Sequence, residues 1–132
     1  MKTFAEFRSD KFPPYGEDEL INPGLWGKRL AEYFVAELPA HGLAAGEPIA
    51  EDWGWYVPVE VDGAALALCC GHQYGDDDEF LVFTDPQEPV TRKLFRQIDV
   101  TAQLTRLVRV VDAILSADPA IRQLSWRVPD RK

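Results

Sequence analysis

Apolar positions follow a helical period in the first third of the chain. Large apolar side chains recur every three or four residues on one stripe, formed by Trp26, Leu30, Tyr33, Phe34 and Leu38. Asn22 is a good N-cap, and Pro23 suits the first helical position, where its missing N–H leaves no hydrogen bond unmade. His41-Gly42 is typical of a helix end, since glycine readily takes the left-handed conformation there. The pattern predicts a helix that packs against a core through this stripe.

From Leu43 onward the period changes to the alternation of strands. We expect one strand face to hold Trp53, Trp55, Val57, Val59 and Val61. Asp62-Gly63 predicts a tight turn into a second strand, Ala64 to Gln73. A further run, Glu79 to Asp85, is apolar on both faces, which is typical of a central, covered strand. The segment from Thr3 to Phe12 alternates imperfectly and is expected to form an edge strand.

A long amphipathic helix is predicted after residue 99, with Asp99 as its cap. Its apolar stripe consists of Val100, Leu104, Leu107, Val108, Val111, Ile114 and Leu115. Asp118-Pro119 ends this helix, and residues 123–128 read as a last short strand.

A short helix is predicted just before it. Pro89 can open this helix, and Val90, Leu94 and Ile98 recur at intervals of four residues.

These elements together predict an α+β fold in a single globular domain spanning residues 1–132. A mostly antiparallel sheet of about four to six strands should be covered on one face by two principal helices. A chain of 132 residues is long enough to bury a proper core.

Charge is spread unevenly along the chain, which carries a net charge of −8. Residues 1–88 hold 18 acidic and 5 basic residues, whereas residues 89–132 hold 4 acidic and 9 basic residues. The acidic total disfavours nucleic acid as a partner, because phosphate contacts need a dense basic patch. We expect the late arginines to lie on the solvated sides of helices, opposite an acidic sheet.

Several features favour a cytoplasmic protein without a membrane partner. No apolar stretch reaches the roughly 20 residues that a transmembrane helix needs. The first residues contain Glu6 and lack the apolar core of a signal peptide. The two cysteines, Cys69 and Cys70, are adjacent and are expected to stay reduced, because a bridge between neighbours is strained.

Possible metal ligands crowd together between Cys69 and Phe80. Cys70 and His72 share a strand face but Cys69 points the other way, and a structural zinc site needs four convergent ligands. An open site formed by Cys70, His72 and a nearby aspartate is an alternative. The favoured interpretation is a hairpin with Gly75 at positive φ and with Asp76, Asp77 and Asp78 facing water. We therefore expect no metal and no cofactor.

The hexamer EDWGWY is the most unusual stretch. Glu51 and Asp52 beside Trp53 and Trp55 could bind sugar or supply acid–base chemistry. Two tryptophans spaced by two on a strand are more often core residues, so we expect a core role first and a partner-binding surface second. Gly54 between them indicates close approach of another backbone.

Four stretches resemble a group of small bacterial proteins without an assigned activity: FRSDKFPP, NPGLWGKRLAEYF, EDWGW and DEFLVF. The resemblance spans nearly the whole length. It implies a bacterial, cytoplasmic, single-domain protein and supplies no catalytic residues. Size and acidity are also similar to those of immunity proteins that neutralise toxins, which is an analogy only.

The leading hypothesis is therefore a non-enzymatic interaction protein, of the immunity type in its most specific form. It would bind a basic partner protein through acids at Glu17–Glu19, Glu51–Asp52 and Asp76–Glu79. The alternative is a small enzyme or ligand-binding domain with a pocket around Trp53, Trp55, His72 and the acids Glu51 and Asp52. A homodimer, formed by an exposed edge strand or by pairing of the acidic and basic parts, is a further possibility.

Overall fold

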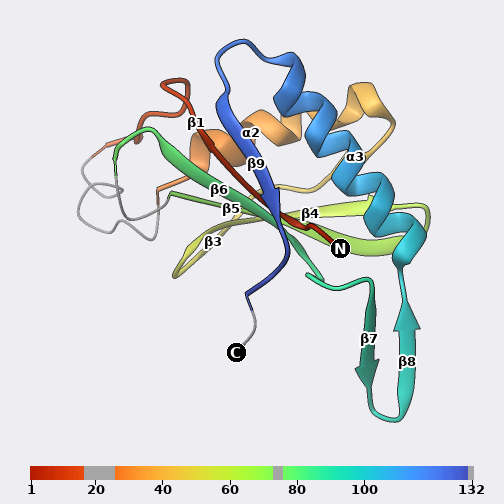
Figure 1. The fold of residues 1–132 in the computed structure, drawn as a ribbon. Helices are drawn as coiled ribbons and strands as arrows, with labels where there is room; N and C mark the ends of the chain where they lie inside the picture. The colour runs from red at the N-terminus through yellow and green to blue at the C-terminus, as the bar shows by residue number, and fades with distance from the viewer. Residues whose placement is uncertain (17–25, 73–75, 131–132) are drawn as a thin grey trace.

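The computed structural model describes residues 1–16, 26–72 and 76–130. These residues form an α+β fold in which helices α2 (Lys28–Glu37) and α3 (Thr101–Ala117) cover one face of an antiparallel sheet (Figure 1). The fold class predicted from the sequence is confirmed. No helix in the described ranges is long and apolar enough to span a membrane.

The main sheet contains seven strands within the described residues, and every strand pair is antiparallel. In sheet order they are β2 (Ala44–Ala45), β4 (Gly54–Val61), β5 (Ala64–His72), β6 (Glu79–Asp85), β1 (Phe4–Arg8) and β9 (Arg122–Arg127), with β3 (Ile49–Glu51) also paired to β4. Because β2 and β3 share one edge of β4, the sheet is six positions wide.

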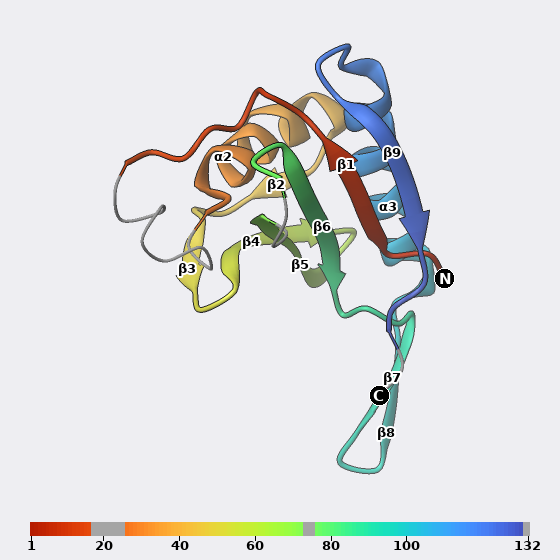
Figure 2. The ribbon, with the colours of Figure 1, turned by 60° about the vertical axis from the view of Figure 1, so that its left-hand side comes forward.

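Strand β1 lies inside the sheet, between β6 and β9 (Figure 2). The prediction that residues 3–12 form an edge strand was therefore wrong. Phe7 is buried on the helix-covered face, whereas Glu6 and Arg8 lie on the opposite face, where charged partners on β6 and β9 compensate them. Those partners lie more than 70 residues away in sequence, so the local pattern of β1 could not reveal them.

The hairpin of β4 and β5 forms as predicted. Asp62 and Gly63 both have positive φ, at 47° and 84°, which is the geometry of a two-residue turn between antiparallel strands. Val57, Val59 and Val61 are buried beneath the helices. The predicted central position of residues 79–85 is also confirmed, because β6 lies between β5 and β1.

Helix α2 begins at Lys28, after Gly27 with φ 134°. The predicted cap at Asn22 and Pro23 lies outside the described residues. The predicted stripe is confirmed at its centre, where Leu30, Phe34 and Leu38 are fully buried. A short 3₁₀ turn, Leu38–His41, leads to Gly42 in the left-handed conformation, so the predicted helix end is confirmed.

Helix α3 packs its predicted stripe into the same core, with Leu104, Leu107, Val111, Ile114 and Leu115 buried. The Asp99 carboxylate accepts hydrogen bonds from the Thr101 hydroxyl and the Thr101 backbone N–H, and these bonds lower the pKa of Asp99. The N-cap position itself is Val100, one residue later than predicted.

Residues 90–99 form a second, separate hairpin instead of the predicted short helix. Its strands are β7 (Val90–Lys93) and β8 (Arg96–Asp99), and it projects away from the sheet and helices (Figures 1 and 2). Short apolar runs fit a helix or a strand equally well by periodicity. A helix here would have had no surface on which to bury its stripe, whereas the two strands satisfy each other's backbone groups.

The late arginines do not all lie on helices as expected. Arg106 and Arg109 belong to α3, but Arg122 and Arg127 lie on β9, and Arg92 and Arg96 lie on the projecting hairpin. The basic side chains of the last third of the chain are thus distributed over the edge strand β9, helix α3 and the projecting hairpin.

Candidate functional site

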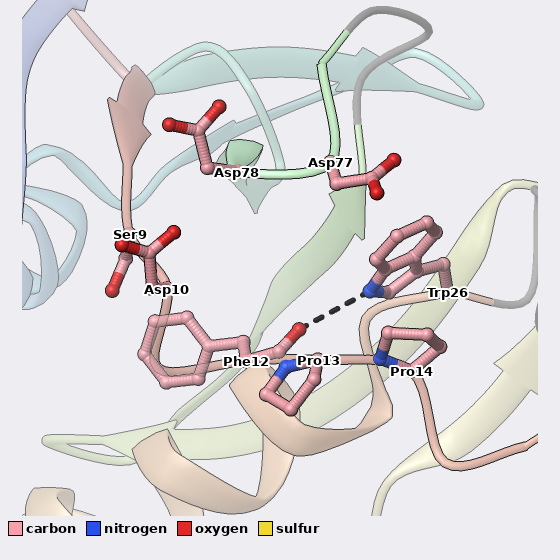
Figure 3. A pocket seen from close by; sticks show the side chains of 8 residues that line it. All are labelled: Ser9, Asp10, Phe12, Pro13, Pro14, Trp26, Asp77 and Asp78. Atoms are coloured by element: carbon pink, nitrogen blue, oxygen red, sulfur yellow. Dashed lines mark hydrogen bonds between the residues drawn. The ribbon is translucent and has the colours of Figure 1, made fainter.

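A pocket of about 350 Å³ opens beside the segment that follows β1, next to the turn that precedes β6. Its described lining residues are Ser9, Asp10, Phe12, Pro13, Pro14, Trp26, Asp77 and Asp78. Figure 3 shows the carboxyl groups of Asp77 and Asp78 across the pocket from the rings of Phe12, Pro13 and Pro14. The pocket therefore combines an apolar floor with an acidic rim, and we call it the acidic pocket.

The chain after β1 is held in place by its own polar groups. Ser9 is buried, its backbone N–H donates to the carbonyl oxygen of Asp78 at 2.9 Å, and its hydroxyl accepts the N–H of Lys11 at 3.1 Å. Serine side chains often bond the backbone two residues on in this way, which turns the chain out of a strand. The bonds attach one wall of the pocket to the turn that carries Asp77 and Asp78.

Trp26 is fixed as part of the floor. Its indole N–H donates to the carbonyl oxygen of Phe12 at 3.2 Å (Figure 3), and its ring stacks on His72 with centroids 3.9 Å apart and planes 5° apart. The indole is almost fully buried. A tryptophan held on one side by a stacked ring and at its polar atom by a hydrogen bond presents a rigid apolar surface.

Much of the acidic turn is neutralised within the protein. The Arg8 guanidinium bonds Asp76 at 3.0 Å, Asp78 at 2.8 Å and Glu79 at 2.5 Å, and Asp76 foremost raises the pKa of Arg8. Arg122 adds a second ion pair to Asp78 at 2.8 Å. The expectation that Asp76 and Asp78 simply face water was incomplete, because both are ion-paired to arginines from neighbouring strands.

Two carboxylates at the pocket remain available to an incoming group. Asp77 is exposed and makes no ion pair with any residue that the structure describes. Asp10 is also exposed, and its ion pair to Arg122 is long at 3.4 Å. The acidic pocket therefore offers uncompensated negative charge above a floor of aromatic and proline rings.

His72 lies behind the pocket. Its Nε2 atom lies 3.1 Å from the carbonyl oxygen of Asp76, which fits an N–H donor at that position. Its Nδ1 atom is buried and has no hydrogen-bond partner among the described residues. His72 therefore supports Trp26 through its ring face, and one of its nitrogens remains unused.

The two thiols are buried on opposite faces of β5, as the strand alternation predicted. Burial raises the pKa of Cys69 to about 12 and raises that of Cys70 well above its ordinary value. Within the described ranges, no three histidine, cysteine, aspartate or glutamate side chains are grouped so that they could hold a metal ion.

The EDWGWY stretch forms the β3–β4 hairpin, with Asp52 and Trp53 as its two turn residues. Trp53 is 43% exposed and packs on Phe83, on the sheet face away from the helices. Trp55 is half-buried against the core, under the Lys28 ammonium. The expectation that both tryptophans share one buried face was therefore wrong for Trp53, because the turn carries its side chain to the other face.

Of the sequence-predicted site residues, the structure brings His72, Asp77 and Asp78 together around Trp26, with Asp76 close by. It places Glu51 and Asp52 in the separate β3–β4 turn, and Glu17–Glu19 lie outside the described residues.

Sequence reasoning missed Asp10, Phe12, Arg8 and the role of Trp26 in the pocket. Trp26 was assigned to the core stripe of a helix, and the stretch from Ser9 to Pro14 contributed only a resemblance. The available signal was a run of serine, acid, aromatic and prolines directly after a strand, which marks a loop with potential binding residues.

Comparisons of the chain with protein-family models, with curated proteins and with solved structures found no match. The site therefore has to be interpreted from its own geometry and charge.

Proposed function

We propose that this protein is an interaction protein that binds a basic, partly apolar segment of another protein at the acidic pocket. The observation that carries the proposal is the combination of a rigid floor built on Trp26 with two exposed carboxylates, the unpaired Asp77 and the weakly paired Asp10. A partner side chain such as lysine or arginine can pack its apolar stem on the rings and place its charge at the rim.

Electrostatics supports the same proposal over a longer range. The acidic first two thirds of the chain would attract a basic partner, and such steering raises association rates at low ionic strength. The buried thiols argue against thiol chemistry, because the thiolate is the reactive form and burial raises both pKa values.

The test is capture of partners by the immobilised protein at low and at moderate salt. We expect a basic protein to be recovered at low salt and to be lost as salt rises, since screening weakens exposed charge pairs. The variant Asp10→Asn/Asp77→Asn should lose the partner. The matched control Glu47→Gln/Glu60→Gln removes the same charge from exposed positions and should retain it.

A third variant, Glu51→Gln/Asp52→Asn, tests the acidic turn that the sequence also predicted. Retention of the partner by this variant and loss by the pocket variant would locate binding at the pocket. Equal binding by all three variants, or no partner at either salt, would refute the proposal.

The more specific form of the proposal is a bacterial, cytoplasmic inhibitor of the immunity type. It predicts that the captured partner is an enzyme with a toxic activity, and that one equivalent of this protein suppresses that activity. If the captured enzyme stays fully active in the complex, the immunity-type form of the proposal is wrong, and the protein is an interaction protein of another kind.

The alternative, a ligand-binding or catalytic pocket around Trp53, Trp55 and His72, has weaker support. Trp53 and Trp55 lie on different faces of the sheet, and His72 is covered by Trp26. The three side chains therefore do not line one common cavity, which a small-molecule site requires.

A further inference from the structure

The tip of the projecting hairpin exposes two large apolar side chains. Leu94 is 86% exposed, and Phe95 is fully exposed. Among the described residues, strands β7 and β8 pair only with each other, and their hairpin projects beyond the body of the protein (Figures 1 and 2). Full exposure of adjacent leucine and phenylalanine side chains is unfavourable in water and marks a surface with a partner.

Turn chemistry does not explain the choice of these two residues. Leu94 and Phe95 are the central residues of a two-residue turn and have φ values of 50° and 67°. Asn-Gly and similar pairs adopt this conformation easily, whereas bulky side chains at positive φ are strained. The two residues at the tip therefore make the turn less stable than favoured turn residues would, and they expose apolar groups.

The tip is also basic. Arg92, Lys93 and Arg96 surround Leu94 and Phe95, and none of the three forms an ion pair within the described part of the chain. Arg106, Arg122 and Arg127 behave differently, since each pairs with an acid of the body. The hairpin therefore carries uncompensated positive charge around an apolar point.

The acidic pocket has the complementary chemistry. Its floor is apolar, its rim holds the uncompensated acid Asp77 and the weakly paired Asp10, and its volume of about 350 Å³ is that of a small binding site. The segment after β1 and the turn before β6, which line the pocket, lie at the opposite end of the molecule from the hairpin in both ribbon views (Figures 1 and 2). The tip therefore cannot reach the pocket of its own chain.

We infer that the Leu94–Phe95 tip of one copy docks into the acidic pocket of a second copy of this chain. The inference depends on the proposed function only in that the pocket binds a basic, apolar segment. Because tip and pocket are different surfaces, repeated contacts build either a closed ring or an open chain of copies. An external partner would then compete with the second copy for the same pocket.

A second copy is favoured over an anionic membrane as the occupant. The net charge of −8 opposes approach of the body to an anionic surface, whereas the pocket of another copy supplies both an apolar floor and acids. Binding to vesicles that contain anionic lipid is therefore an outcome to be measured, not the expected one.

The test uses sedimentation velocity of the full chain over a range of concentrations and salt. The wild type should assemble with rising concentration at low salt and dissociate at high salt. The tip variant Leu94→Asn/Phe95→Gly should lose about tenfold or more in association constant, because apolar anchors dominate such contacts. This variant installs a favoured turn, so the hairpin should fold at least as well as in the wild type.

The pocket variant Asp10→Asn/Asp77→Asn should also be monomeric, and Glu47→Gln/Glu60→Gln should assemble like the wild type. An equimolar mixture of the tip and pocket variants is the decisive sample. One retains a working pocket and the other a working tip, so the mixture should form a one-to-one dimer and nothing larger.

Three results would overturn the inference: a wild type that stays monomeric at every concentration, a tip variant that assembles normally, or a mixture without a dimer. Vesicle binding by a monomeric wild type through Leu94 and Phe95 would identify the membrane as the occupant instead. In each case, capture of a basic partner that depends on Asp10 and Asp77 would show that the proposed function survives.

Discussion

At the scale of single residues, two glycines allow the backbone to pack closely against strand β5. Gly54 lies so close to β5 that an added Cβ would be 2.3 Å from the carbonyl oxygen of Cys70, and a Cβ on Gly27 would lie 3.0 Å from the same oxygen. The strand pattern around Gly54 predicted this close approach, and the structure confirms it. The approach of Gly27 was not predicted, because it depends on how the start of α2 meets the sheet.

Gly54→Ala should destabilise the protein by about 3 kcal/mol or more, since backbone atoms cannot yield to the new methyl group and φ is 151°. Gly63→Ala is the matched control. It also has positive φ, at 84°, but nothing lies within 4 Å of the added atom, so about 1 kcal/mol should be lost. Urea unfolding measures both, and equal losses would show that the contact with Cys70 is unimportant.

At the scale of elements, the acidic pocket exists because β1 lies beside β6. That pairing places Arg8 next to Glu79 and brings the acids of the turn onto one guanidinium. The sequence shows strong local signals for each strand of the β4–β5 hairpin, because Asp62-Gly63 joins neighbours in the chain. It shows no local signal that β1 pairs with β6, because the two strands are separated by about 70 residues, so neither the strand order nor the pocket could be predicted.

Arg8→Met should lower the urea midpoint of unfolding clearly, because Asp76, Asp78 and Glu79 would then repel one another without a shared cation. Arg106→Met removes a single exposed ion pair to Asp62 and should have a much smaller effect. A loss with Arg8→Met no larger than with Arg106→Met would mean that the acidic turn needs no neutralisation.

A second link between elements joins the segment after β1 to the end of α3. Asp118 accepts hydrogen bonds from the Lys11 ammonium at 2.7 Å and from the Tyr33 hydroxyl at 2.8 Å. The Lys11 bond is the main cause that lowers the pKa of Asp118 below its ordinary 3.8, and burial, aided by Asp118, raises the pKa of Tyr33. The carboxylate is therefore the form that stabilises the fold.

Asp118→Asn should cost about 1 kcal/mol of unfolding free energy at pH 7. Because the folded pKa is lowered, this contribution is complete above the ordinary pKa of 3.8 and is lost as pH falls through the lower, folded value. The difference between wild type and variant should stay constant from pH 8 to about 5 and vanish in stronger acid. Asp52→Asn, at an exposed turn, is the matched control and should change the unfolding free energy at pH 7 much less.

At the scale of the whole molecule, part of the uneven charge of the sequence is compensated by ion pairs within the fold. Arg106 pairs with Asp62, Arg122 with Asp78, and Arg127 with Glu6, so basic residues of the last third neutralise acids of the first two thirds. The sequence revealed the imbalance but not where it is compensated. Asp77 at the acidic pocket and Arg92, Lys93 and Arg96 on the β7–β8 hairpin form no ion pair within the described ranges.

The hairpin should be separable from the rest of the molecule. Its described side chains contribute no buried residue to the core, and the hydrogen bond from the Val100 N–H to the Pro89 carbonyl, 2.8 Å, closes its base. Replacing residues 91–98 by Gly-Gly keeps the Val90–Asp99 pair, to which a two-residue turn is suited. It also keeps Asp99, which bonds the first turn of α3.

The free energy of unfolding of this shortened chain should lie within about 1 kcal/mol of the wild-type value. Closure entropy changes only slowly when a surface loop is shortened. Thermal and urea unfolding followed by circular dichroism provide the measurement, and an unchanged denaturant slope would show that the body buries the same surface. The shortened chain should also be monomeric while still capturing a basic partner through Asp10 and Asp77. A large loss of stability would mean instead that the hairpin supports the fold, and its exposed Leu94 and Phe95 would then need a structural explanation.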